Sequence, residues 1–166
     1  MGSYLKKLHA ELEGILTNAS GAAFEKAPAG KWNSNQILEH LYLTYKNTNK
    51  GIAKCMADGR PLATSASMKH RAKSLVVLGL GYLPEGAKAP ERSLPRGLSG
   101  DEVRATVLTE MERMASGLDD CERRFGVSTK IMDHPILGPL TGEEWRKFHW
   151  LHGRHHVRQI RERMTG

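Results

Sequence analysis

Four of the eight histidines in this 166-residue chain lie between His149 and His156. A helix makes one turn every 3.6 residues, so His149, His152 and His156 would share one face of a helix. His152 and His156 are four residues apart, which puts their Cβ atoms about 5–6 Å from each other, close enough to bind one metal ion. Neutral imidazole is the commonest zinc ligand and also suits nickel, copper and iron. The spacing therefore predicts metal binding on this helix.

A third ligand is expected from another helix, and His40 is the candidate. It lies on a polar stripe whose other members are Asn33, Gln36, Thr44 and Asn47. Three histidines and a bound water form the open kind of site that catalytic zinc has. A lone His-x-x-x-His pair is often a surface pattern, but three inward imidazoles without a shared partner would be costly to bury. No Glu follows His152 directly, so the metalloprotease motif His-Glu-x-x-His is excluded.

Further polar residues near this set could support or carry out chemistry. His149 is interpreted as a fourth ligand, a substrate-facing acid or base, or a packed core residue. Gln159 is expected to orient His156 or a bound water, and His155 to hydrogen-bond beside the site or face a neighbouring helix. The remaining expectations are a turn role for His134, surface positions for His9 and His70, and burial for Cys55, Cys121, Met111 and Met114.

The periodicity of apolar residues is helical and shows no convincing alternating strand. Capping boxes are predicted at Asn33–Gln36, Ser99–Glu102 and Thr141–Glu144. A loop rich in Gly and Pro, residues 79–100, is expected to be functional, for example a lid, or poorly ordered. Four long helices without strands predict an all-α, single-domain helical bundle over 1–166. The long helices are expected over about 3–17, 33–56, 99–126 and 141–164, and a shorter helix over 68–78.

Composition limits the classes of function. With 39% hydrophobic and 26% charged residues and no long apolar run, the chain is expected to have no membrane partner. Two cysteines are too few for a disulfide framework, so a cytoplasmic location is expected. The net charge of +7 favours anionic partners. Nucleic acid is disfavoured, because no nucleic-acid motif is present and aromatic residues make up only 6%.

Two segments resemble the DinB-like superfamily of DinB/YfiT-type metalloenzymes. Residues 151–160 match its pattern Asn-His-x-x-His-His-x-x-Gln-Ile except for Leu151 at the first position, and Trp32 with residues 39–41 matches its earlier histidine segment. Residues 134–145 look like an uncharacterised branch of it. The resemblance implies a four-helix bundle with up-down-down-up connectivity and a divalent metal on His40, His152 and His156. Members with known activity include transferases that use a low-molecular-weight thiol and maleylpyruvate isomerases.

From residues and resemblance together, we expect a metal-dependent enzyme of thiol transferase or hydrolase type with zinc or nickel. The basic charge would suit an anionic small-molecule substrate. The alternative is a non-catalytic metal-binding or interaction module in a stress response. Trp150, Val157 and Met164 recur every seven residues on one flank of the last helix, which either the first helix or a second copy would cover. A homodimer is expected, because dimers are common in the resembling family.

Overall fold

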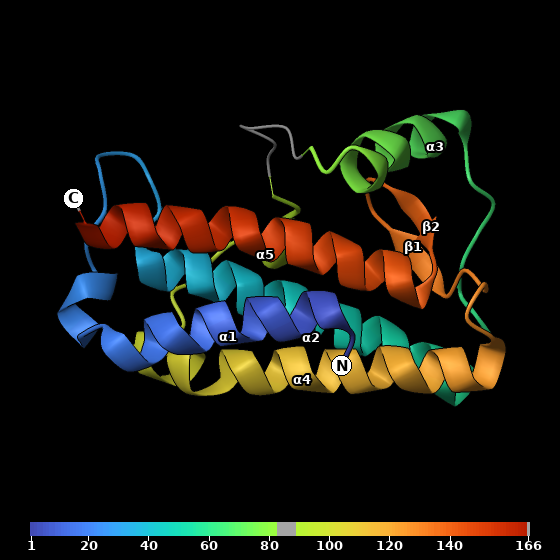
Figure 1. Ribbon diagram of the computed structural model, residues 1–166, viewed down its shortest axis with the longest axis horizontal. Helices are drawn as coiled ribbons and strands as arrows, with labels where there is room; N and C mark the ends of the chain where they lie inside the picture. The colour runs from blue at the N-terminus through green and yellow to red at the C-terminus, as the bar shows by residue number, and fades with distance from the viewer. Residues whose placement is uncertain (83–88, 166) are drawn as a thin grey trace.

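The computed structural model describes residues 1–82 and 89–165 and is mostly helical (Figure 1). Four long helices lie side by side, and α2 packs against α4 over much of its length. In Figure 1, α2 and α4 run in one direction, and α1 and α5 run in the other. The long helices are α1 (Ser3–Asn18), α2 (Ser34–Asp58), α4 (Gly100–Phe125) and α5 (Gly142–Thr165).

Shorter elements join these helices. The 3-10 turns η1 (Gly21–Phe24) and η3 (Glu91–Ser93) precede α2 and α4. The helix α3 (Met68–Ser74) continues into a π-helical turn, η2 (Leu75–Gly79), close to the end expected for the short helix. Together they lie beside the first half of α5 (Figure 1).

The expectation of a chain without strands is wrong at one place. Strands β1 (Met132–His134) and β2 (Gly138–Leu140) form an antiparallel hairpin, with Met132 opposite Leu140. Three residues per strand are too few for an alternating pattern to be visible in the sequence. The hairpin contacts α2, α3 and α5, so it shapes one wall between the helices.

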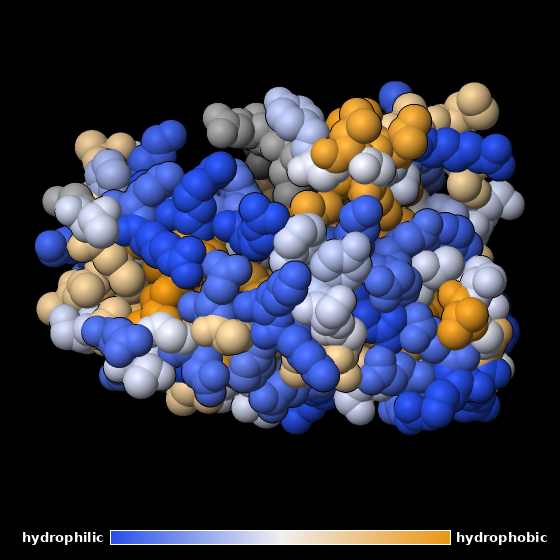
Figure 2. All heavy atoms as spheres, viewed as in Figure 1, coloured by the Kyte–Doolittle hydropathy of each residue, from blue (hydrophilic) through white to orange (hydrophobic). Residues whose placement is uncertain are grey.

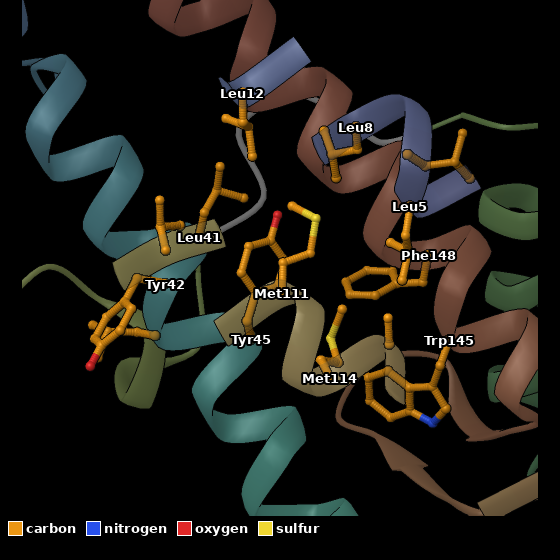
Figure 3. Close-up of a cluster of buried hydrophobic side chains, with 14 of the residues drawn as sticks. Leu5, Leu8, Leu12, Leu41, Tyr42, Tyr45, Met111, Met114, Trp145 and Phe148 are labelled. Carbon is orange, nitrogen blue, oxygen red and sulfur yellow. The ribbon is translucent and has the colours of Figure 1, made fainter. Parts of the chain in front are cut away.

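The core lies between the long helices, and its side chains come from the faces that the helical periodicity predicted. Leu5, Leu8 and Leu12 of α1 reach toward Tyr45 of α2 and Met111 of α4 (Figure 3). Cys55, Cys121 and Met114 are also buried, as expected, and both cysteines are free.

Two of the three predicted capping boxes are confirmed. Asn33 and Gln36 exchange side-chain and backbone hydrogen bonds at the start of α2, and Thr141 and Glu144 do the same before α5. The box at Ser99 is wrong, because its side chain makes no capping hydrogen bond. The acidic residues Asp101 and Glu102 lie in the first turn of α4, where they favour the positive end of the helix.

The heptad flank of α5 is covered within the chain. Tyr4 of α1 packs on Trp150 with ring centroids 5.0 Å apart, and Val157 is only 1% exposed. Met164, at the far end, is partly buried against the same core. The homodimer remains a prediction, but this flank no longer supports it.

The close approach of α1 and α5 depends on Gly153. A Cβ at this position would collide with the side chain of Leu8, which is fully buried. Gly153→Ala is therefore expected to lower the free energy of unfolding by about 1–3 kcal/mol, as overpacking does. Urea titration followed by circular dichroism measures this loss.

Gly14 of α1 provides the matched control. A Cβ there meets no atom within 4 Å. Gly14→Ala should raise the free energy of unfolding by about 0.5–1 kcal/mol, because alanine is the better helix former. Equal effects of the two variants would mean that α1 and α5 do not pack through Gly153.

Most of the surface in view is hydrophilic, with a hydrophobic area near α3 and smaller ones elsewhere (Figure 2). The exposed large apolar side chains of this region are Met68, Leu75, Val76, Leu80 and Tyr82. Among the described helices, none combines the length and the apolar character that crossing a bilayer requires.

Candidate metal centre

Three histidines from two helices meet at one point. Nε2 of His152 lies 3.1 Å from Nε2 of His40 and 3.1 Å from Nε2 of His156. His40 comes from the polar stripe of α2, and the other two come from successive turns of α5. These are the three residues that the sequence predicted, and one ring nitrogen from each lies within 4.8 Å of those of the other two.

In two of these rings the other nitrogen, Nδ1, is hydrogen-bonded to an oxygen acceptor. Nδ1–H of His40 donates to the backbone carbonyl of Ser93 at 2.7 Å, and Nδ1–H of His156 donates to Oε1 of Gln159 at 2.8 Å. A neutral imidazole has one N–H, so both rings must present an Nε2 lone pair toward His152. Such outer hydrogen bonds fix the tautomer of metal-binding histidines.

Hydrogen bonds among the three rings cannot satisfy these lone pairs. His152 in its neutral form carries one hydrogen and can donate it to only one of its two neighbours. Its Nδ1 is buried without a hydrogen-bond partner among the described residues. A cation shared by the three Nε2 atoms would remove the conflict. Nitrogens on a tetrahedral zinc lie about 3.3 Å apart for Zn–N bonds of about 2.0–2.1 Å, close to the two 3.1 Å separations.

Burial keeps these imidazoles neutral. It lowers the pKa of His156 to about 3 and lowers the pKa of His152 well below its usual value, with the neighbouring histidines adding to both effects. The pKa of His40 is also lowered by burial, while the carbonyl of Ser93 acts in the opposite direction. Only the neutral form can bind a metal, so the environment favours the form that binds.

The three histidines face a cavity of about 810 Å³. Trp32, Thr44 and Asn47 line it on one side, and residues of the hairpin and the first half of α5 line another. The ring of Trp32 lies 5.4 Å from that of His40, and Phe148 stacks on His152. No further His, Cys, Asp or Glu joins the three histidines among the residues the structure describes, so their open side faces this cavity.

The second half of the 79–100 segment forms another wall of the cavity. Backbone N–H groups of Arg96 and Gly97 donate to the carboxylate of Glu39, which is 2% exposed. This contact holds η3 against α2, where the carbonyl of Ser93 reaches His40. The described part of this segment therefore contacts a candidate metal ligand, and a functional role such as a lid stays a prediction; residues 83–88 lie outside the described part.

His149, the candidate for catalysis, is a core residue. It is 0% exposed and does not line the cavity. The hydroxyl of Thr48 donates to the carbonyl of Thr44 and therefore accepts from Nε2–H of His149. Trp145 stacks on the imidazole of His149, and burial lowers the pKa of His149 to about 3.

The other polar candidates fall in three places. Gln159 contacts His156 as expected, and His155 lines the cavity with its ring 5.1 Å from that of His156. His134 has the predicted turn role, since its Nδ1 accepts from the backbone N–H groups of Ile136 and Leu137. His70 is a correction, because its ring packs against Gly138 of the hairpin with Nδ1 buried rather than lying at the surface.

The contact between Gln159 and His156 can be tested separately. Gln159→Ala removes the acceptor for Nδ1–H of His156 without touching the three Nε2 atoms. Metal affinity is expected to fall about 10–100-fold, the usual cost of losing such a partner, while helix content stays the same. Competition with a chromophoric chelator measures the affinity. An unchanged affinity would show that this hydrogen bond does not orient the ring.

The fold and these three ring nitrogens define the molecule as a mostly helical protein with a candidate three-histidine metal site. The chain belongs to the DUF1569 family of proteins of unknown function, whose family model matches residues 6–163. No curated protein and no solved structure matched in the respective searches.

Proposed function

We propose that this protein is a divalent-metal-dependent enzyme that acts on a small molecule. The observation that supports this most is the convergence of three neutral Nε2 atoms on an open cavity, with two of the rings fixed by oxygen acceptors. Zinc and nickel are the expected ions, because both suit imidazole ligands. A bound ion would act as a Lewis acid and lower the pKa of a water or a substrate thiol.

The reaction would be of thiol transferase or hydrolase type, with a low-molecular-weight thiol as co-substrate in the first case. Within the protein, Ser93 and Gln159 would keep the ligand rings in place. Trp32 and Phe148 would shield from water the rings of His40 and His152 that they pack against. The antiparallel pairs of long helices and the motif around His152 also support a DinB-like four-helix bundle with up-down-down-up connectivity. A cytoplasmic location is part of the same proposal.

Elemental analysis of protein purified without an affinity metal column tests the metal. About one zinc or nickel ion per chain is expected, as a three-histidine site predicts. The loaded protein is then incubated with electrophiles plus low-molecular-weight thiols, and separately with ester and amide substrates. Mass spectrometry distinguishes thiol adducts from hydrolysis products. Metal without turnover of any substrate would favour the non-catalytic module instead.

A further inference from the structure

Two cationic side chains line the same cavity as the histidines. Lys31 precedes α2, and Arg92 lies on η3, one residue before the carbonyl that holds His40. Neither side chain has a hydrogen bond or ion pair with any residue in the described ranges 1–82 and 89–165. A cation that lines a cavity without a partner is free to bind an anion.

The acidic side chain in the described part of the cavity lining is hydrogen-bonded to another residue. Among the lining residues that the structure describes, Asp133 is the acidic one. Its carboxylate accepts from the backbone N–H of Thr64 at 3.1 Å and from the Thr64 hydroxyl at 2.6 Å. No ion pair joins Asp133 to either cation among the described residues, whose cavity lining therefore carries two cationic side chains against one carboxylate.

The positive charge of Arg92 also acts on His134, which lines the same cavity. His134 lies on the hairpin wall, and its pKa is lowered to about 4, first by burial and then by the positive charge of Arg92. Arg92 is exposed at this lining, so its guanidinium is accessible to a ligand. The same lining includes the apolar side chains of Pro90, Leu94 and Phe148.

We infer that the cavity takes a small organic anion, whose carboxylate or similar group pairs with Arg92 while its apolar body lies along the wall toward the three histidines. Lys31 adds a second positive charge on the same lining. Arginine is the suited partner, because its planar guanidinium can bind a carboxylate through two parallel hydrogen bonds. This inference deepens the proposed function and rests on it for the reaction, but not for the binding.

The test uses matched pairs of ligands that differ only in charge. Phenylacetate, cinnamate, isovalerate and indoleacetate are each compared with their primary amides by ligand-observed NMR, at about 150 mM salt so that weak surface attraction is screened. At least one acid is expected to bind about tenfold more tightly than its amide, which corresponds to about 1.4 kcal/mol. If no acid binds more tightly than its amide, the inference is wrong.

Variants locate the binding. Arg92→Gln should remove the preference for the acid, and Arg92→Glu should reverse it in favour of the amide. Arg60→Gln is the matched control, because Arg60 is exposed and does not line the cavity. A preference that survives in both Arg92 variants would overturn the inference, since the acid would then be bound elsewhere, for example by the metal. Lys31→Gln, with a smaller expected loss, provides a second measurement if an Arg92 variant fails to fold.

Each measurement is repeated on protein treated with EDTA. If the protein binds no metal yet prefers acids through Arg92, the proposed function fails and this inference stands. If the protein binds one ion and shows no preference for acids, the inference fails and the metal proposal stands.

Discussion

Substitution of any one of His40, His152 and His156 by alanine is expected to abolish stoichiometric metal binding. Each removes one of three Nε2 ligands, and two imidazoles hold a divalent ion far more weakly than three. Metal per chain, measured by elemental analysis after dialysis, should fall at least about tenfold in each variant. Helix content by circular dichroism should persist, because a 166-residue chain with this core does not depend on a metal to fold.

His9 is the control for this experiment. It lies on α1, and its Nε2 is 2.9 Å from a carboxylate oxygen of Glu112, far from the cavity-lining residues. His9→Ala should retain the metal content of the unaltered protein. Full metal content in His40→Ala would show that α2 contributes no ligand and that the site is wrong.

The second large effect is acid sensitivity of the protein stripped of metal. Burial lowers the pKa of several histidines; among them it is about 4 for His134 and about 3 for His149 and His156. Below pH 6.5 the unfolded chain takes up protons that the folded chain does not. Their contribution to stability is therefore complete above pH 6.5 and is lost as pH falls toward 3–4.

The expected loss is about 1.4 kcal/mol per histidine for each pH unit below 6.5. For the three together it reaches about 4 kcal/mol near pH 5.5, a large part of the 5–15 kcal/mol typical of a domain. Urea unfolding at several pH values measures it. His149→Leu should make the profile shallower by one histidine's share, whereas a flat profile above pH 5 would contradict the burial of neutral imidazoles.

The histidines of the candidate metal site could be predicted from the sequence because their signal is local spacing. His152 and His156 are one helical turn apart, and His40 lies on a polar stripe beside the apolar face of its helix. The long helices were predictable for the same reason, since periodicity and capping residues such as Asn33 and Thr141 are local signals.

The parts that escaped prediction depend on contacts between distant residues. The partner of His40 is the backbone carbonyl of Ser93, 53 residues away, and a carbonyl has no residue type to mark it. Arg92 is one of many cations in a basic chain, and only the packing of η3 against α2 brings it to the cavity. The burial of His149 and of Nδ1 of His70 likewise depends on which neighbours cover them. Residue type and local spacing do not reveal it.

The position of η3 has a thermodynamic consequence. One short turn carries both Arg92, on the cavity, and the carbonyl that orients His40. Anything that fixes this turn more firmly in place also strengthens the orientation of the metal ligand. Linkage then requires the effect to be reciprocal: an anion that tightens metal binding by some factor is itself bound more tightly, by the same factor, when the metal is present. The two ligands of this cavity would therefore bind cooperatively although they contact different residues.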